Sequence, residues 1–426
     1  MAHSTSTDPV RVILLLKAAT YRARPFLEAA ARLGIEVIKG IDLAPALAGY
    51  WQVPLGLQFD EPEKAAQAIV DFARETPVQA VLAVDDSATL IAAMASERLG
   101  LVHNRSEAAL AARNKYRMRQ MLAAAGVRSP QFKLYETADD PAQIAAGVTY
   151  PCVVKPLLLS GSRGVIRANN PLEFEAAFRR LERMLRGMQP TSGSTQILVE
   201  DFIPGVEVAL EGILDQAQLR VLALFDKPDP LDGPFFEETI YVTPSRLPGP
   251  VQAEIAKCAG RAALALGLRH GPVHAELRIN EAGPWIVEIA GRSIGGLCSQ
   301  TLRFGPDVSL EELILRQAVG LDIEAWLSDE TLPDNQRAGG VMMIPIPAAG
   351  MLKAVTGVAA ARAVPAIESV EITAQLHQPL IPLPEGESYL GFIFARGNRP
   401  EQVEAALRQA HRRLHFEIEP MLPVIA

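Results

Sequence analysis

The chain has 426 residues, 49% of them hydrophobic, so it can bury a large core and is long enough for two or three domains. The net charge of −8 and the lack of a Lys/Arg-rich block argue against nucleic acid and anionic membrane as partners, and residues 12–16, the longest early apolar run, are too few to span a bilayer. The three cysteines, Cys152, Cys258 and Cys298, form no CxxC pair, which argues against a disulfide framework and a zinc site. We therefore expect a cytoplasmic protein that acts on small molecules.

The first hundred residues alternate between strand-like and helix-like patterns. Residues 10–17 favour a strand, residues 24–33 a helix, and residues 35–38 the start of a second strand. A further strand over residues 78–84 runs into a polar cap before a helix over residues 88–99. This β-α-β order predicts a parallel, doubly wound domain. The G-x-G-x-x-G pattern is missing from it, so dinucleotide binding has little support.

The middle of the chain mixes helices with short strands. One basic helix is predicted over residues 106–125, and Asn170 is predicted to cap a helix that opens at Pro171. Strands are expected at residues 152–155, 197–201, 206–214 and 219–225. A Pro-rich segment over residues 228–250 predicts a long loop, which is long enough to suggest a functional role. The last region begins near residue 338 and ends in a helix over residues 400–414.

Two alternating strands around Gly283 form the most informative segment. A three-residue turn with this glycine in the left-handed position sets Asn280 opposite Pro284, and that register pairs Glu276 with Glu288. Carboxylates directly across a ladder lie roughly 5 Å apart at Cβ and repel each other unless a cation lies between them. Magnesium that bridges both glutamates and ATP phosphates is one interpretation. A pair of exposed glutamates facing water fits the spacing equally well.

Two further segments favour the nucleotide site. Lys155 ends a strand just before the small-residue loop Ser160-Gly161-Ser162, whose backbone N–H groups can approach phosphate oxygens. The loop does not match a P-loop, and most such loops are plain turns. Glu200 and Glu207 flank a Pro-Gly break, and their carboxylates can accept hydrogen bonds from an adenine amino group and from ribose hydroxyls. An ordinary sheet edge is the alternative for this segment.

Taken together, these motifs resemble the ATP-grasp superfamily. The resemblance rests on Val153-Val154-Lys155-Pro156 with its Ser/Gly loop, on Val199-Glu200-x-Phe202-Ile203-x-Gly205-x-Glu207, and on His274-x-Glu276 with Glu288-Ile289-Ala290-Gly291-Arg292. It implies an α/β and α+β architecture in three parts. These are a doubly wound pre-ATP-grasp domain over residues 1–105, an ATP-grasp domain over residues 106–332 with a mobile lid near residues 129–195, and a carboxylase-like C-terminal domain over residues 333–426.

The resemblance also implies roles for individual residues. ATP would contact Lys115, Lys155, Ser160, Gly161, Ser162, Glu200, Asp201, Phe202, Ile203 and Glu207, with Glu200 and the Ile203 backbone at the adenine and Glu207 at the ribose. Magnesium, or manganese in its place, would be held by Glu276 and Glu288. The catalytic candidates are Lys155, His274 and Arg292. Where several relatives carry Asn two residues after the second metal-binding Glu, this chain has Ala290.

Within the superfamily, the Glu-Ile-Ala-Gly-Arg run followed by Ile294-Gly295-Gly296 is similar to the L-amino acid ligase branch. Residues 235–245 are similar to a loop that lines the amino-acid site there, so Glu238 would meet a substrate ammonium. The other implied substrate residues are Tyr241, Arg292, Gly295 and Gly296.

The implied function is an ATP-dependent carboxylate–amine ligase that forms an amide or peptide bond through an acyl phosphate and releases ADP and phosphate. Its partners would be small-molecule carboxylates and amines, and the assembly can be a homodimer. Two alternatives stay open: an enzyme that activates bicarbonate, and a nucleotide-binding regulator without turnover.

Overall fold

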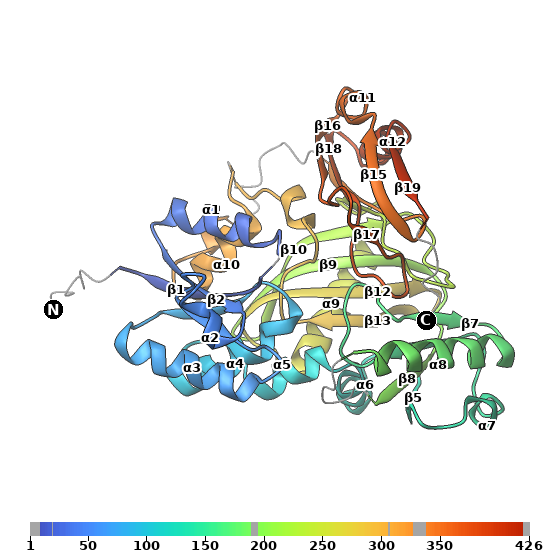
Figure 1. Cartoon of the computed structure of the whole chain (residues 1–426), viewed down its shortest axis with the longest axis horizontal. Helices are drawn as coiled ribbons and strands as arrows, with labels where there is room; N and C mark the ends of the chain where they lie inside the picture. The colour runs from blue at the N-terminus through green and yellow to red at the C-terminus, as the bar shows by residue number, and fades with distance from the viewer. Residues whose placement is uncertain (1–8, 19, 189–194, 306, 327–337, 421–426) are drawn as a thin grey trace.

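The computed structural model describes residues 9–18, 20–188, 195–305, 307–326 and 338–420, and within them the chain forms four sheets (Figure 1). No helix in these ranges is both long and apolar enough to cross a bilayer.

The N-terminal sheet is parallel, with strand order β3-β2-β1-β4. Its strands are β1 (Arg11–Lys17), β2 (Glu36–Asp42), β3 (Leu55–Leu57) and β4 (Ala80–Ala83). Leu14 and Leu16 of β1 cluster with α1 (Ala23–Leu33) and α10 (Leu310–Ala318), while Ile13 and Leu15 cluster with α3 (Pro62–Glu75) and α4 (Thr89–Leu99). Because alternate side chains of a strand point to opposite faces, helices cover both sides of this sheet, which confirms the predicted doubly wound domain. Two short helical segments complete it, α2 (Pro45–Ala48) and η1 (Asp86–Ala88).

Asn114 divides the helix predicted over residues 106–125 into α5 (Ser106–Arg113) and α6 (Lys115–Ala124). Its backbone is extended, and its Oδ1 accepts hydrogen bonds from the backbone nitrogens of Tyr116 and Arg117, both at 3.1 Å. The prediction of one helix is wrong because Asn bonds more favourably as an N-cap than inside a helix. As a consequence, Lys115 begins α6.

The second sheet is antiparallel, has the order β5-β8-β6-β7, and occupies the region predicted to form a mobile lid (Figure 1). Its elements are β5 (Phe132–Glu136), α7 (Pro141–Ala145), β6 (Cys152–Pro156), β7 (Ile166–Ala168), α8 (Pro171–Arg186) and β8 (Gln196–Asp201). Asn170 caps α8 as predicted, since its side chain accepts a hydrogen bond from the Glu173 nitrogen at 3.0 Å. Residues 189–194 of the predicted lid lie outside the described residues, and β8 extends the lid's sheet to Asp201.

The largest sheet has eight strands in the order β13-β12-β9-β10-β11-β14-β18-β16. These are β9 (Val206–Asp215), β10 (Gln218–Lys227), β11 (Ile240–Thr243), β12 (Gly271–Asn280), β13 (Gly283–Ala290), β14 (Ala338–Ile344), β16 (Ile367–Ile372) and β18 (Gly391–Gly397). Helix α9 (Gly249–Ala265) contributes Ile255, Ala259, Ala262 and Ala263 to the core on one face. The predicted domain boundary after residue 332 lies outside the described residues, yet the sheet is continuous from one side of it to the other.

Strand β11 lies inside the loop predicted over residues 228–250, so the prediction of an uninterrupted loop is wrong. Ile240 and Val242 bury their side chains in the C-terminal core, and β11 pairs with both β10 and β14. The rest of the C-terminal region comprises α11 (Val358–Arg362), α12 (Pro400–His411) and a small sheet of β17 (Pro379–Leu380), β15 (Gly350–Thr356) and β19 (His415–Glu419). Two short 3-10 turns, η2 (Cys298–Thr301) and η3 (Glu324–Trp326), lie between β13 and β14 in the chain.

The β12–β13 hairpin pairs Glu276 with Glu288, as predicted, but reaches this register by another route. Asn280 pairs with Gly283 and not with Pro284, so the predicted turn is one residue too long. The ladder then shifts between Glu276 and its neighbour in β12, which leaves one extra residue on β13. This bulge restores the pairing of the two glutamates.

Candidate active site

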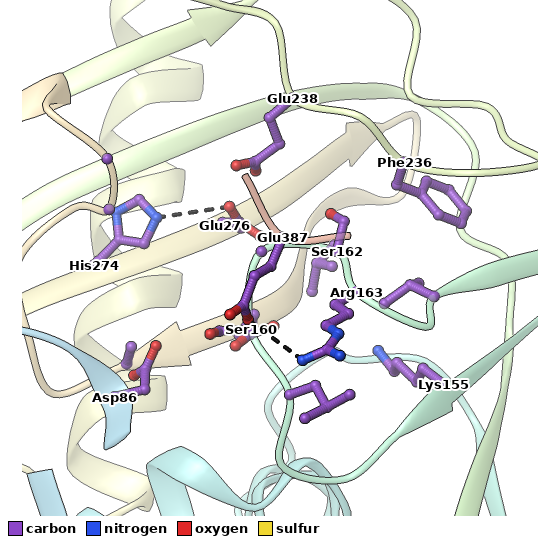
Figure 2. A pocket seen from close by; sticks show the side chains of 18 of the residues that line it. Asp86, Lys155, Ser160, Ser162, Arg163, Phe236, Glu238, His274, Glu276 and Glu387 are labelled. Atoms are coloured by element: carbon purple, nitrogen blue, oxygen red, sulfur yellow. Dashed lines mark ion pairs between the residues drawn. The ribbon is translucent and has the colours of Figure 1, made fainter. Parts of the chain in front are cut away.

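Every residue that the sequence analysis assigned to ATP, metal or substrate lines one cavity of about 610 Å³ (Figure 2). The N-terminal domain contributes Asp86, the lid contributes Lys155 and the Ser160-Gly161-Ser162 loop, and the large sheet contributes Glu276. The C-terminal region closes one side with residues 387–389. A volume of this size suits a nucleotide-sized ligand.

Lys227 lies behind the acidic wall of this cavity, where it contacts three glutamates that line it. Its Nζ lies 2.9 Å from Glu207 Oε1, 2.6 Å from Glu238 Oε1 and 2.9 Å from Glu276 Oε1, and its side chain is 3% exposed. Oxygens of these three glutamates come within 4.8 Å of one another, which is close enough to hold a metal ion. Glu288 is not part of that group. The ammonium therefore occupies the place where a cation would balance three carboxylates.

Burial and charge act in opposite directions on this cluster. Burial lowers the pKa of Lys227, but the three glutamates outweigh it and the pKa lies well above its ordinary value. Burial and the negative charge of Glu276 raise the pKa of Glu238 to about 7. Glu276 itself has a strongly lowered pKa, because Lys227 and His274 outweigh the effect of burial. Figure 2 shows the carboxylates of Glu238 and Glu276 facing each other.

His274 is held between two carboxylates. Its Nδ1 lies 3.2 Å from Glu211 Oε2 and its Nε2 lies 3.6 Å from Glu276 Oε1. Burial lowers the pKa of His274, but its bonds to both carboxylates outweigh this and raise the pKa to about 9. A histidine that is already protonated at neutral pH cannot accept a further proton, so the geometry favours a positioning role over that of a general base.

Lys155 and Glu200 form a buried ion pair at the lid side of the cavity. Lys155 Nζ lies 2.5 Å from Glu200 Oε2, and Arg119 Nε lies 2.7 Å from Glu200 Oε1. Both oxygens of Glu200 thus face cations, which hold the pKa of this carboxyl below its ordinary value although burial raises it. With these partners, Glu200 orients Lys155 in addition to any contact with adenine.

Lys115 points at the second glutamate of the hairpin. Its Nζ donates to the Leu159 carbonyl at 2.7 Å and lies 3.4 Å from Glu288 Oε2. The break at Asn114 puts this lysine at the start of a helix and turns it toward the loop that precedes Ser160. Lys115 is 5% exposed, so little water screens its charge.

The predicted adenine side of the cavity is built around Phe202. The Arg167 and Arg278 guanidinium carbons lie 4.0 Å and 4.8 Å from its ring centroid, and the Phe236 ring stacks on it at 6.3 Å. Arg278 also pairs with Glu207 at 2.9 Å and donates to the Ile203 carbonyl at 2.9 Å. Stacked planar groups of this kind provide a surface for a flat ring.

Arg292 connects the large sheet to the N-terminal domain. Its Nη2 lies 2.7 Å from Asp86 Oδ2, and the charge of Asp86 raises the pKa of this guanidinium although burial opposes it. The loop that follows is fixed from two sides, because Arg22 donates to the Ile294 carbonyl at 2.9 Å and the Ile294 nitrogen donates to Glu211 at 3.0 Å. Gly295 and Gly296 therefore enter the cavity wall on an anchored loop.

The lid's glycine loop is held by the C-terminal region. The Gly164 nitrogen donates to the Pro384 carbonyl at 2.8 Å, and Arg163 Nε donates to the Glu385 carbonyl at 2.9 Å. Arg180 Nε lies 2.7 Å from Glu385 Oε1. Figure 2 shows Arg163 reaching toward Glu387, at a distance of 3.7 Å. These contacts form a latch between the predicted lid and the C-terminal region.

Sequence reasoning missed four residues of this site: Asp86 as the partner of Arg292, together with Arg119, Glu211 and Lys227. Each acts through a partner that is distant in the chain, as Lys227 does with Glu276, 49 residues away. One local signal was present for Lys227, since it ends β10 two residues after an apolar run, and a lysine is unusual in a buried strand.

Comparison with known proteins gives three consecutive matches. Residues 27–102 match the family described as ATP-grasp N-terminal domain, residues 148–301 the ATP-grasp domain, and residues 342–419 the L-amino acid ligase C-terminal domain 2. The chain is an ATP-grasp protein. It belongs to the branch of L-amino acid ligases and carboxylase-like proteins, which confirms the family and the fold expected from its motifs.

Relatives of this ATP-grasp protein match along most of the chain. The crystal structure of L-amino acid ligase from Bacillus licheniformis superposes with a TM-score of 0.80 at 25% identity, over 97% of this chain and 100% of that one. Alanine–anticapsin ligase of Bacillus subtilis strain 168 is 25% identical over 400 residues, covering 85% of this chain and 82% of the relative. An uncharacterised protein of Sinorhizobium fredii is 25% identical over 307 residues, and the match spans 61% of that relative's length.

Proposed function

We propose that this ATP-grasp protein is an ADP-forming ligase that joins the carboxylate of a small molecule to an amine, with an amino acid as one substrate. The observation that carries the proposal is the single cavity in which Lys155, Glu276, Glu288 and Arg292 meet Glu238. The chain resembles an L-amino acid ligase along nearly its whole length, and this likeness supports an amide product over a carboxylated one. The three cysteines are free, which fits a cytoplasmic enzyme.

ATP would lie with its base near Phe202, between the lid and the large sheet. Lys115 and Lys155 are buried ammonium groups and would neutralise its phosphates, while the Ser160-Gly161-Ser162 loop would cover them. The oxygen donors of Glu276 and Glu288 fit magnesium, since they are hard ligands paired across one hairpin. A bound magnesium would neutralise charge that develops on the transferred phosphoryl group.

The first step is attack of the substrate carboxylate oxygen on the γ-phosphorus of ATP, which breaks the bond to ADP and leaves an acyl phosphate. Arg292 would brace either the carboxylate or the phosphoryl oxygens with its planar guanidinium, and Asp86 sets its orientation. The closed lid would exclude water, which otherwise hydrolyses an acyl phosphate. An amine then attacks the acyl carbon and phosphate leaves.

The amine must lose a proton before it attacks, because an ammonium has no lone pair. Glu238 is the carboxylate suited to hold the amino group, and its pKa of about 7 lets it exchange a proton near neutral pH. In this structure its oxygen is bound to Lys227, so a substrate ammonium has to compete with that lysine. Tyr241 Oη lies 3.5 Å from Glu276 and completes this wall.

The test is to incubate the purified protein with ATP, magnesium and pools of amino acids, to follow ADP and to search for condensed products by mass. We expect amino-acid-dependent ADP release and a product that lacks one water relative to its two parts. Glu288→Gln should abolish ADP release, while Glu281→Gln, a change at an exposed glutamate in the same hairpin, should not. Release stimulated only by bicarbonate would contradict the ligase proposal, and full activity of Glu288→Gln would reject the metal assignment.

A further inference from the structure

A second cavity of about 640 Å³ lies beside the first, between the N-terminal domain and the large sheet. Its walls come from β4, from α5 and the loop before it, from the start of β12, and from α10. Asp215 and Gln216, both exposed, form part of its rim. The size falls in the range of small-molecule sites, and none of the residues proposed to bind ATP, metal or substrate lines it.

Most of the second cavity is apolar. Side chains from four separate elements face it: Phe26 from α1, Leu82 from β4, Ile314 from α10, and Leu268 after α9. The polar atoms nearby are largely satisfied within the protein. The Asn104 side chain bonds the backbone of Arg269 and His270, and His103 Nδ1 lies 3.1 Å from the Asn104 carbonyl oxygen.

Arg113 is the exception. It is half-buried at the end of α5, its side chain has no hydrogen bond or ion pair to any other described residue, and its Nε is buried without a partner. Buried donors are almost always paired, so the unpaired Nε is costly. Burial lowers the pKa of Arg113, and the charges of nearby Asp86 and Asp85 oppose that effect without bonding to it. An anion is the ligand that would satisfy this group.

Arg113 and Asp86 line both cavities, so they form the wall between them. Asp86 in turn holds Arg292 through two contacts of 2.7 and 2.8 Å. A negative group bound to Arg113 would therefore lie close to the pair that orients Arg292. The second cavity is placed to influence the first, or to receive part of a substrate from it.

We propose that the second cavity binds a small amphipathic carboxylate, with its carboxylate on Arg113 and its hydrocarbon part against Phe26, Leu82 and Ile314. Such a molecule can have two sources. It can be the amine substrate, an apolar amino acid whose carboxylate Arg113 holds, or a separate effector that acts through Asp86. The first source rests on the proposed ligase function, whereas binding itself does not.

The binding test uses 3-phenylpropanoate and its neutral amide, 3-phenylpropanamide, titrated into the full chain by calorimetry without ATP. We expect the carboxylate to bind and the amide to bind about 10-fold to 100-fold more weakly, as for the loss of one charge-assisted contact. Arg113→Met should weaken binding of the carboxylate to the same degree, and Arg113→Lys should restore part of the affinity. Ala318→Trp, which narrows the cavity from α10, should weaken the binding of both compounds.

Glu238→Gln is the control for binding in the first cavity and should leave both affinities unchanged. Equal affinity of Arg113→Met and the wild type for the carboxylate, or loss of binding in Glu238→Gln alone, would overturn the proposal. These measurements need no turnover, so they remain decisive even if no ligation product is ever found.

L-phenylalanine in the turnover assay distinguishes between the two sources, the amine substrate and a separate effector. A condensed product that contains phenylalanine, with a KM for phenylalanine raised in Arg113→Met, identifies the amine substrate. A change in ADP release without incorporation of phenylalanine identifies an effector. No effect of phenylalanine or of 3-phenylpropanoate on binding or turnover would contradict the proposal.

Discussion

Arg292 Nη2 and Asp86 Oδ2 lie 2.7 Å apart, so the guanidinium that follows β13 is oriented by a carboxylate of the N-terminal domain. The two residues are 206 positions apart in the chain. Their side chains are only 12% and 20% exposed, so solvent screens the pair weakly. The N-terminal domain therefore contributes to the geometry of the site as well as to its walls.

Asp86→Asn should destabilise the fold by about 1–3 kcal/mol, because the amide keeps a hydrogen bond but leaves the charge of Arg292 beside Arg22 unbalanced. ADP release should fall further than stability suggests, since Arg292 loses its fixed orientation. Urea unfolding and turnover of both proteins check this. Asp71→Asn, a change at an exposed pair within α3, is the control and should alter neither.

The difference in stability between wild type and Asp86→Asn should also depend on pH. Burial raises the pKa of Asp86, but the charge of Arg292 and its hydrogen bonds outweigh this, so the pKa lies below its ordinary value of 3.8. A carboxyl with a lowered pKa stabilises the fold above its unfolded pKa, and that contribution fades as pH falls through the folded pKa. The stability gap between wild type and Asp86→Asn should be full at pH 7 and should shrink below about pH 4. A gap that stays constant down to pH 3 would contradict this account.

Lys227→Met should leave Glu207, Glu238 and Glu276 without their shared cation. Removing one partner of a buried ion pair costs about 3–5 kcal/mol, and part of this loss will be relieved by protonation of Glu238. Added magnesium should narrow the stability gap to wild type, because the freed oxygens suit a divalent ion.

Urea unfolding with and without magnesium measures the effect of Lys227→Met. Lys257→Met is the matched control, since that lysine is 68% exposed on α9. A Lys227→Met protein with wild-type stability would show that the ammonium does not hold the cluster together.

Lys155→Met should weaken ATP binding by about 10-fold or more, because a buried ammonium that can contact phosphate is lost. Arg119 still pairs with Glu200, so the fold should survive. Equilibrium binding of an ATP analogue measures the change. Lys133→Met, at an exposed lysine on the same lid, should bind the analogue like wild type, and equal affinity for Lys155→Met would remove this lysine from the nucleotide site.

Glu385→Ala should loosen the latch between the C-terminal region and the lid. The pair with Arg180 is about two-fifths exposed on each side, so its loss is worth only about 1 kcal/mol or less. Amide hydrogen exchange over residues 158–165 should rise severalfold while exchange in the N-terminal sheet stays constant. Unchanged exchange in the glycine loop would show that the two backbone contacts at Pro384 and Glu385 are sufficient.

Local patterns predicted the elements that depend on short-range chemistry. The cap at Asn170, the alternation of β1, and the pairing of Glu276 with Glu288 follow from residues close in the chain. The hairpin shows where such reasoning reaches its limit, since the turn was predicted one residue too long and a bulge, which no spacing rule reveals, restored the register.

The polar partners inside the cavity depend on contacts between distant segments. Lys227 meets Glu207, Glu238 and Glu276 only because β9, β10, β11 and β12 are neighbours in one sheet. Its charge looks solvated in the sequence, and burial becomes acceptable only when three carboxylates surround it. Strand β11 was missed for a similar reason. Its four residues lie between prolines and are too few to show a strand pattern, and they form a strand by pairing with β14, which is distant in the chain.

The large sheet continues through β11 into β14, β18 and β16, so its hydrogen-bonded ladder joins the ATP-grasp strands to the C-terminal region without a flexible joint. Cutting the chain before β14 would expose the edge of β11 and the apolar side chains beside it, and such a fragment should aggregate instead of forming a smaller enzyme. The sheet of the predicted lid shares no strand with this ladder, so we expect any rigid-body opening of the site to occur there. Substrates would then enter and products would leave on the side that the lid uncovers.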